Sequence, residues 1–203
     1  ITQSSDRALI CQAAKDQQIN VVVIASGIAS FGPFQDVSDA EMTQLIQTNV
    51  TAPMQLASGL LPELHRCQRA QLIFVGSALG RIGVPGFSAY GASKAAIHGF
   101  AEGLRHELSN TSVRVQLLAP RATQTSFNDS KTEEFNRLTG TQSDSPERVA
   151  NALLSLIESE AAERFIGFPE RLGVRLNGLL GEGMDGSFKS HVRALAAVFS
   201  KKL

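Results

Sequence analysis

The chain has 203 residues, of which 43% are hydrophobic and 19% are charged, and its 19 basic and 19 acidic residues give a formal net charge of zero. This is the composition of a globular protein that can bury a sizeable core. The balanced charge argues against nucleic acid or an anionic membrane as the main partner. No apolar run reaches the ~18 residues that a membrane-spanning helix needs.

The cysteines and histidines carry no sign of a metal site. Cys11 and Cys67 are the only two cysteines, and neither has metal-ligand spacing or a partner motif. We interpret both as reduced thiols of a cytoplasmic protein. The four histidines show no zinc-helix spacing and are expected on the surface or in the core. We therefore predict no metal.

The first half of the chain alternates strand and helix patterns. Residues 19–27, "INVVVIASG", form a continuous apolar run ended by Ser-Gly, as in a strand buried on both faces. Residues 39–64 predict one long helix, which Ser38 or Asp39 can cap. Residues 70–77, "AQLIFVGS", predict a second buried strand.

The second half continues the alternation. Residues 88–109 predict another long helix, and residues 112–120 a third strand that ends at a proline. The polar segment 121–145 predicts a long loop with room for a short helix. Residues 145–159, "SPERVANALLSLIES", begin with serine and proline in the cap and first helical positions. Residues 163–169 predict a short last strand.

The C-terminal segment differs from the rest. Five glycines lie between residues 173 and 186, and a basic amphipathic stretch follows over residues 188–202. Such a stretch can lie on a membrane surface. A helix that packs on its own protein or on a partner subunit is the favoured interpretation.

This order of elements predicts an α/β fold with a doubly wound parallel sheet, Rossmann-like, and a single domain over residues 1–203. In such sheets the chemistry gathers at the carboxyl ends of the strands. The rule selects Gly27, Ser77 and Pro120 with the residues that follow each of them.

The only tyrosine of the chain lies four residues before a lysine, at the start of the helix that follows Ser77. Tyr90 and Lys94 therefore share one helix face. An ammonium nearby lowers the pKa of a phenol from about 10. A tyrosine tuned in this way can take a proton from an alcohol or give one to a carbonyl. Such pairs also arise by chance, but Ser77 can hold the same substrate oxygen with its hydroxyl.

These residues resemble the short-chain dehydrogenase/reductase family, in the branch with a serine followed by Tyr-x-x-x-Lys. Ser77 stands in "VGSALGRIG", and Tyr90 and Lys94 stand in "YGASK". Asn49 in "IQTNVTAP" matches the family's active-site asparagine. The segments "VVVIASG" and "PRATQT" are similar to the family's Asn-Asn-Ala-Gly strand and its Pro-Gly-x-x-x-Thr stretch.

The resemblance implies an oxidoreductase that transfers hydride between NAD or NADP and an alcohol or ketone. It implies that Tyr90 moves the proton, Ser77 holds the substrate oxygen, Lys94 lowers the pKa of the tyrosine, and Asn49 anchors a relay water. The cofactor-binding residues that it implies are Ser26, Gly27, Asn49, Tyr90, Lys94, Pro120, Arg121, Thr123 and Thr125. The alternative is a relative without catalysis that binds or scaffolds.

The chain also departs from the family. Only Gly27 matches in the strand that usually reads Asn-Asn-Ala-Gly, and Arg121 replaces the glycine after Pro120. The family's glycine-rich phosphate loop, which precedes these motifs, is not found in the chain, which begins at Ile1 with a short loop and a helical pattern. We expect the natural protein to be longer. Without the preceding strands, the strand at 19–27 is expected to be an open sheet edge.

Pro53 lies inside the first long helix, four residues after Asn49. It has no N–H to give to the Asn49 carbonyl, so that carbonyl is expected to be free and the helix kinked. In the family a water on this carbonyl joins the lysine in a proton relay. The alternative is that Pro53 is merely a tolerated kink.

The sequence indicates the substrate class less directly than the catalytic residues. Residues 79–87 and 121–145 are expected to line the substrate pocket, and their apolar side chains suit an acyl chain, a steroid or a small hydrophobic ketone equally.

The helices at 39–64 and 88–109 carry more apolar surface than one sheet face needs. Because the family commonly dimerises through this helix pair, we expect a homodimer or homotetramer.

Overall fold

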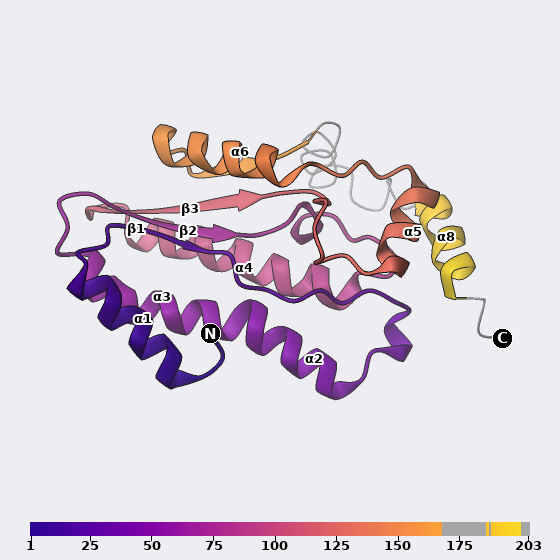
Figure 1. The fold of residues 1–203 in the computed structure, drawn as a ribbon, viewed down its shortest axis with the longest axis horizontal. Helices are drawn as coiled ribbons and strands as arrows, with labels where there is room; N and C mark the ends of the chain where they lie inside the picture. Colours follow the sequence, from indigo (N-terminus) through magenta and orange to yellow (C-terminus); the bar gives the residue numbers. More distant parts are fainter. Residues whose placement is uncertain (168–185, 187, 200–203) are drawn as a thin grey trace.

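The computed structural model of the protein describes residues 1–167, 186 and 188–199. Within them lies a four-stranded parallel sheet with helices on both faces, the predicted Rossmann-like arrangement (Figure 1). The strands are β1 (Val21–Ile24), β2 (Ala70–Val75), β3 (Val113–Ala119) and β4 (Glu163–Phe165), in the order β1-β2-β3-β4. All three neighbouring pairs are parallel, so the carboxyl ends of the strands meet at one edge.

The helices form two layers and an end cap (Figure 1). They are α1 (Ser4–Asp16), α2 (Asp39–Ile46), α3 (Ala52–Leu64), α4 (Ser88–Glu107), α5 (Ser130–Thr139), α6 (Pro146–Ser159) and α8 (Lys189–Phe199). Helices α1, α3 and α4 cover one face of the sheet and α6 covers the other. Helices α5 and α8 contact each other beyond the carboxyl ends of the strands. None of the described helices is long and apolar enough to cross a membrane.

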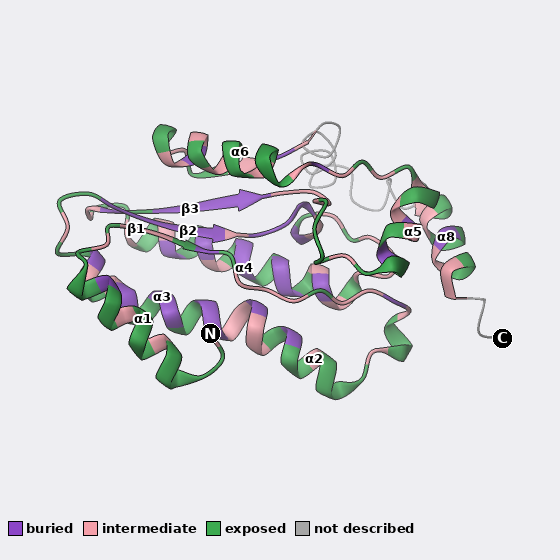
Figure 2. Ribbon diagram, viewed as in Figure 1, coloured by how far each residue is buried: buried purple, intermediate pink, exposed green. Residues whose placement is uncertain are grey.

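The two faces of the sheet bury separate apolar clusters, because side chains alternate along each strand. Leu72 and Phe74 of β2 pack against α3 and α4, whereas Ile73 between them packs against α6. Figure 2 shows the buried residues concentrated along β2, β3 and the helix surfaces that face them. At β1, Val23 is 36% exposed, as expected for an edge strand.

The predicted helix over residues 39–64 is interrupted by a π turn. Ser38 caps α2 in a capping box with Glu41. After α2, the π turn spans Gln47–Thr51, and the Ala52 amide donates to the carbonyl five residues before it. Because Pro53 has no N–H, the ordinary helical bond to the Asn49 carbonyl cannot form, and a π turn shifts the bonding pattern at this point.

The segments after β3 refine the prediction. The polar stretch 121–145 contains α5, whose first turn is capped by the Asp129 carboxylate and which ends at Gly140 in the left-handed region, with φ 69°. Ser145 caps α6 as predicted. The last predicted strand is shorter, as β4, and residues 168–169 lie outside the described residues, like most of the glycine-rich segment. Helix α8 packs on α5, which agrees with the favoured interpretation of the basic stretch.

Candidate active site

Ser77 lies just beyond the carboxyl end of β2, where the chain turns sharply. The amide of Gly76 donates to the Leu118 carbonyl at 2.8 Å, and the amide of Ala78 donates to the Pro120 carbonyl at 2.9 Å. These bonds tie the turn to the end of β3. The Ser77 hydroxyl accepts a hydrogen bond from the Leu79 amide at 3.2 Å, and it remains able to donate its own proton.

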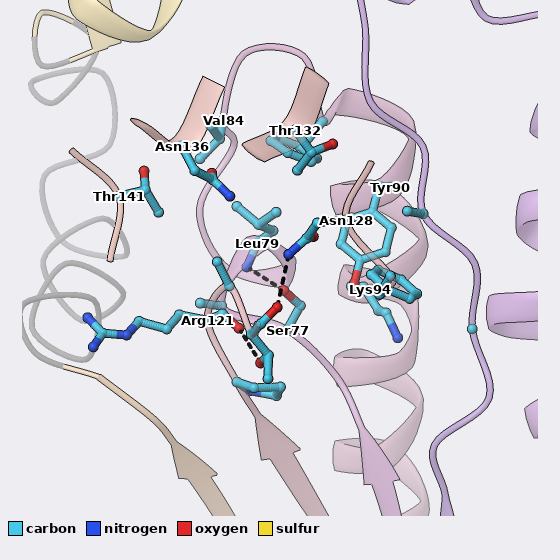
Figure 3. A pocket seen from close by; sticks show the side chains of 18 of the residues that line it. Ser77, Leu79, Val84, Tyr90, Lys94, Arg121, Asn128, Thr132, Asn136 and Thr141 are labelled. Atoms are coloured by element: carbon cyan, nitrogen blue, oxygen red, sulfur yellow. Dashed lines mark hydrogen bonds between the residues drawn. The ribbon is translucent and has the colours of Figure 1, made fainter. Parts of the chain in front are cut away.

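Tyr90 and Lys94 lie on the first two turns of α4, facing Ser77. The Lys94 Nζ lies 5.8 Å from the centroid of the Tyr90 ring and donates to the Val75 carbonyl at 3.1 Å. The Ser77 hydroxyl lies close enough to the Tyr90 phenol to lower its pKa. Figure 3 shows the Ser77 and Tyr90 hydroxyls on the same side of the cavity, with the Lys94 amine close by. The structure thus brings together the three residues that the sequence singled out.

Burial shifts the pKa of both ionisable groups away from the charged form. It raises the pKa of Tyr90 to about 12, and the nearby Ser77 hydroxyl only partly opposes this. It lowers the pKa of Lys94 to about 8. The direction at Tyr90 is opposite to the predicted one, because desolvation of the buried phenol outweighs the effect of its neighbours.

Asn49 lies behind the site rather than in the cavity wall. Its Oδ1 accepts from the Ile28 amide at 2.8 Å, and its Nδ2 donates to the Ile28 carbonyl at 3.0 Å and to the Ser93 hydroxyl at 3.1 Å. Ser93 in turn donates to the Tyr90 carbonyl at 2.7 Å. Through these bonds Asn49 fixes the segment after β1 against the helix that carries Tyr90.

The segment after β1 fits the reacting end of a nicotinamide dinucleotide. A Cβ atom added at Gly27 would lie 3.3 Å from the Asn49 Oδ1 and 3.4 Å from the Lys94 Nζ, so glycine lets this segment lie close to both side chains. The Ser26 hydroxyl oxygen is buried and has no hydrogen-bond partner among the described residues. Lys94 has one such partner, which leaves ammonium protons for a ligand. Of these two polar groups, the Lys94 amine borders the cavity where the ribose and ring of NAD or NADP would lie, and the Ser26 hydroxyl lies beside Gly27, which also borders it.

The segment from Pro120 to Thr125 forms the opposite wall, with Pro120, Arg121, Thr123 and Thr125 all lining the cavity. The guanidinium of Arg121 points away from Ser77 and Tyr90 (Figure 3). It forms a two-pronged ion pair with Asp144, with Nε 3.0 Å from Oδ2 and Nη2 2.9 Å from Oδ1. Main-chain bonds from Gln124 to Asp144 and from Asp144 to Ala122 join the same two segments.

A cavity of about 720 Å³ opens between these walls. Most of its lining is apolar. The apolar and aromatic residues that contribute include Val75, Leu79, Ile82, Val84, Phe87, Phe127, Phe135 and Phe188. They come from the end of β2, the predicted segment 79–87, the predicted segment 121–145 and the residue just before α8. Of the ten predicted site residues, Ser26 and Asn49 do not line this cavity and the other eight do.

Three positioning contacts were missed by the sequence reasoning. Ser93 lies in "YGASK" directly before Lys94, and its position one turn after Tyr90 could have indicated a bond to the Tyr90 carbonyl. The bond between Asp144 and Arg121 had no local signal, because the two residues are 23 positions apart. His98 was expected to be an ordinary core or surface histidine, yet it contacts the Ser77 amide.

The described residues hold no cluster of side chains suited to a metal ion. Cys11 and Cys67 are both free thiols, in agreement with the prediction.

Comparison with known proteins agrees with this geometry. The protein "Oxidoreductase claN" of Passalora fulva is 39% identical over 123 residues, which cover 60% of this chain and 56% of that protein. "Ketoacyl reductase HetN" of Nostoc sp. is 29% identical over 166 residues, which cover 80% of this chain and 57% of that protein. The chain thus spans less than three fifths of the length of either relative.

A crystal structure of a short chain dehydrogenase from Burkholderia cenocepacia in complex with NADP superposes with a TM-score of 0.79 at 22% identity, over 93% of this chain and 75% of that chain. This shows that the two proteins share a fold. The family model described as short chain dehydrogenase matches residues 2–136, which include β1 to β3, Asn49, Ser77, Tyr90 and Lys94. The chain therefore belongs to the short-chain dehydrogenase family.

Proposed function

We propose that the protein is an NAD(P)-dependent oxidoreductase that interconverts a large apolar ketone and its alcohol. The observation that carries the proposal is the meeting of the Ser77 hydroxyl, the Tyr90 hydroxyl and the Lys94 amine at one wall of an apolar cavity. A nicotinamide dinucleotide held between Gly27 and Pro120 in this cavity would supply hydride exchange with the substrate carbon. The relatives crystallised with NADP and NADPH support this choice of cofactor.

In the reductive direction, Tyr90 acts as the general acid. Burial raises the pKa of Tyr90 to about 12, so the phenol is fully protonated near neutral pH. It can donate its proton to the carbonyl oxygen as negative charge develops there. Ser77 donates a second hydrogen bond to the same oxygen and fixes its position.

Lys94 stabilises the product of this proton transfer. Its pKa of about 8 keeps most of the ammonium charged at pH 7, close to the ring of Tyr90. That charge stabilises the tyrosinate that remains after Tyr90 has given up its proton. Lys94 and Gly27 both line the cavity, and the remaining ammonium protons can bind the ribose of the cofactor there.

The further cofactor contacts come from both walls. Ser26 and Gly27 border the ribose and ring from the β1 side, while Pro120, Arg121, Thr123 and Thr125 border them from the β3 side. Asn49 positions the first of these segments. We further propose that its main-chain carbonyl, which Pro53 cannot engage, binds a water that leads protons to Lys94.

The cavity walls favour a large apolar substrate. Four phenylalanines line it, and the only charged side chains in the wall are Lys94 and Arg121, among the residues that the structure describes. Relatives named as a ketoacyl reductase and a 3-ketodihydrosphingosine reductase, whose names both indicate a ketone on an acyl or sphingoid chain, support this substrate class. Of the three classes predicted, we therefore favour a ketone on a long apolar chain or ring system over a small ketone.

The test measures NADPH and NADH oxidation by the full-length protein with benzil, a large apolar diketone, and with acetone as the small competitor. Tyr90→Phe keeps the ring and removes the proton donor, so turnover of benzil should fall by about 10²–10⁴. Ser88→Ala, which removes an exposed hydroxyl at the start of the same helix, should leave turnover unchanged. Near-normal turnover by a folded Tyr90→Phe variant would show the mechanism to be wrong.

A further inference from the structure

His98 lies on α4, one turn beyond Lys94 and two turns beyond Tyr90, with its ring against the turn that carries Ser77. Only 1% of its surface is exposed. Its Nε2 accepts a hydrogen bond from the main-chain amide of Ser77 at 3.4 Å. Helix α4 therefore carries both Tyr90, the proposed proton donor, and His98, which contacts the main chain of Ser77.

The glycines of the turn allow this contact. A Cβ atom added at Gly76 would lie 2.4 Å from the His98 Nε2, and one added at Gly80 would lie 3.0 Å from the same nitrogen. Any larger residue at Gly76 would therefore push the turn away from α4. On its other side the His98 ring meets the edge of the Phe165 ring, with the centroids 5.9 Å apart. The imidazole is thus enclosed between the turn, its own helix and β4.

The His98 ring is neutral, which leaves one of its nitrogens able to accept a hydrogen bond. Burial, with the positive charges of Arg81 and Lys94, lowers its pKa to about 4, so the ring is neutral at working pH. With Nε2 accepting from Ser77, the ring proton resides on Nδ1. That nitrogen is buried and has no hydrogen-bond partner among the described residues. An unpaired buried donor destabilises the folded state, and an apolar side chain of similar size would avoid this cost.

We propose that His98 is a positioning residue, whose Nε2 holds the Ser77 main chain at a fixed place relative to α4 so that the Ser77 and Tyr90 hydroxyls reach the same substrate oxygen. The proposal rests on the function proposed above. Ser77 enters the site from β2 and Tyr90 from α4, and the chain between them passes through the long segment 81–87. Catalysis needs side chains placed within about 0.5 Å of the productive geometry. His98 joins the Ser77 turn directly to α4, whereas the segment 81–87 joins them only through a long stretch of chain.

Two substitutions separate the acceptor from the volume of the ring. His98→Gln places an amide oxygen near the position of Nε2 and can keep the bond to the Ser77 amide. His98→Met fills a similar volume and offers no comparable acceptor. In the full-length protein with NADPH and benzil, His98→Met should lower kcat about 10- to 100-fold, as expected for a misplaced catalytic group. The KM for NADPH should change little, and His98→Gln should recover most of the lost kcat.

A double-mutant comparison tests whether the effect acts through Ser77. Combined with Ser77→Ala, His98→Met should cause almost no further loss, because the positioned hydroxyl is already gone. An equal loss with and without the Ser77 hydroxyl would overturn the proposal, and so would equal kcat in the Gln and Met variants.

A measurement without turnover separates this proposal from the proposed function. Hydrogen exchange of the Ser77 amide, followed by NMR, should be slow in the wild type and in His98→Gln and faster in His98→Met. Equal protection in all three proteins would overturn the positioning role. Protection in this pattern together with no reductase activity in the wild type would support the positioning of Ser77 and refute the proposed function alone.

Discussion

The ion pair between Arg121 and Asp144 offers a sharp test of how the wall of the cavity is held. The two side chains are 6% and 1% exposed, and they meet through two parallel hydrogen bonds. Asp144→Asn keeps the shape of the side chain but removes the carboxylate charge that meets the buried guanidinium through these two bonds. Breaking a buried pair from one side typically costs about 3–5 kcal/mol. At about 2–4 °C per kcal/mol for a chain of this size, the Tm should fall by about 6–20 °C.

Two control variants show whether the loss of stability in Asp144→Asn comes from burial of the ion pair or from the loss of a charge as such. Arg148 also lies 3.0 Å from the Asp144 carboxylate, but its side chain is 59% exposed. Arg148→Ala should therefore cost no more than about 1 kcal/mol. The double variant Arg121→Met, Asp144→Leu removes both buried charges and should regain much of the stability lost in Asp144→Asn. The assay is calorimetry or a circular dichroism melt of the full-length protein at pH 7. A Tm for Asp144→Asn equal to that of Arg148→Ala would refute the reasoning from burial.

The remaining predictions concern pH, packing and assembly. The pKa of His98 is lowered from an ordinary 6.5 to about 4 in the folded state, so the unfolded state binds a proton at a higher pH than the folded state does. The free energy of unfolding should therefore drop as pH falls from about 6.5 to 4. A pH series of urea melts should show a smaller drop in His98→Gln. Reduction of benzil should slow as pH rises through about 8, where Lys94 loses its proton, and a rate that stays flat to pH 10 would contradict its assigned role. Gly76→Ala should lower the Tm, because its methyl group would meet the imidazole at 2.4 Å, whereas Gly103→Ala, which meets nothing within 4 Å, should not. The full-length protein should be a homodimer or homotetramer in light scattering, and a monomer mass at every concentration would reject this.

Local chemistry accounts for what the sequence could predict. Apolar runs such as 70–77 indicate buried strands because both sheet faces are covered, and Ser38 and Ser145 mark helix starts because their hydroxyls bond the free amides there. The pairing of Tyr90 with Lys94 follows from helix geometry alone. These features involve residues close together in the chain, so a single sequence contains the information.

Features that depend on distant contacts could not be predicted in this way. A short helix was allowed for in the polar stretch 121–145, but its place was not predicted, because the apolar contacts of α5 come from other elements, among them Phe31 and Phe87 against Phe135. The pKa of Tyr90 was predicted in the wrong direction because desolvation depends on how deeply the folded chain buries the phenol. The missing N–H of Pro53 was predictable, but its outcome, a π turn rather than a simple kink, depends on the packing of the whole helix.

The proposed catalytic groups share one structural feature, which is that buried polar contacts hold the elements carrying them. Asn49 and Ser93 join the segment after β1 to α4, His98 joins the Ser77 turn to α4, and the ion pair of Arg121 joins the segment after β3 to the start of α6. Apolar packing tolerates small shifts, since cores accept many substitutions at little cost. A hydrogen bond has a defined length and direction, so it can set the distance between two elements more narrowly. We interpret the unpaired nitrogen of His98 as a cost of this arrangement, accepted where geometry matters most for the proposed chemistry.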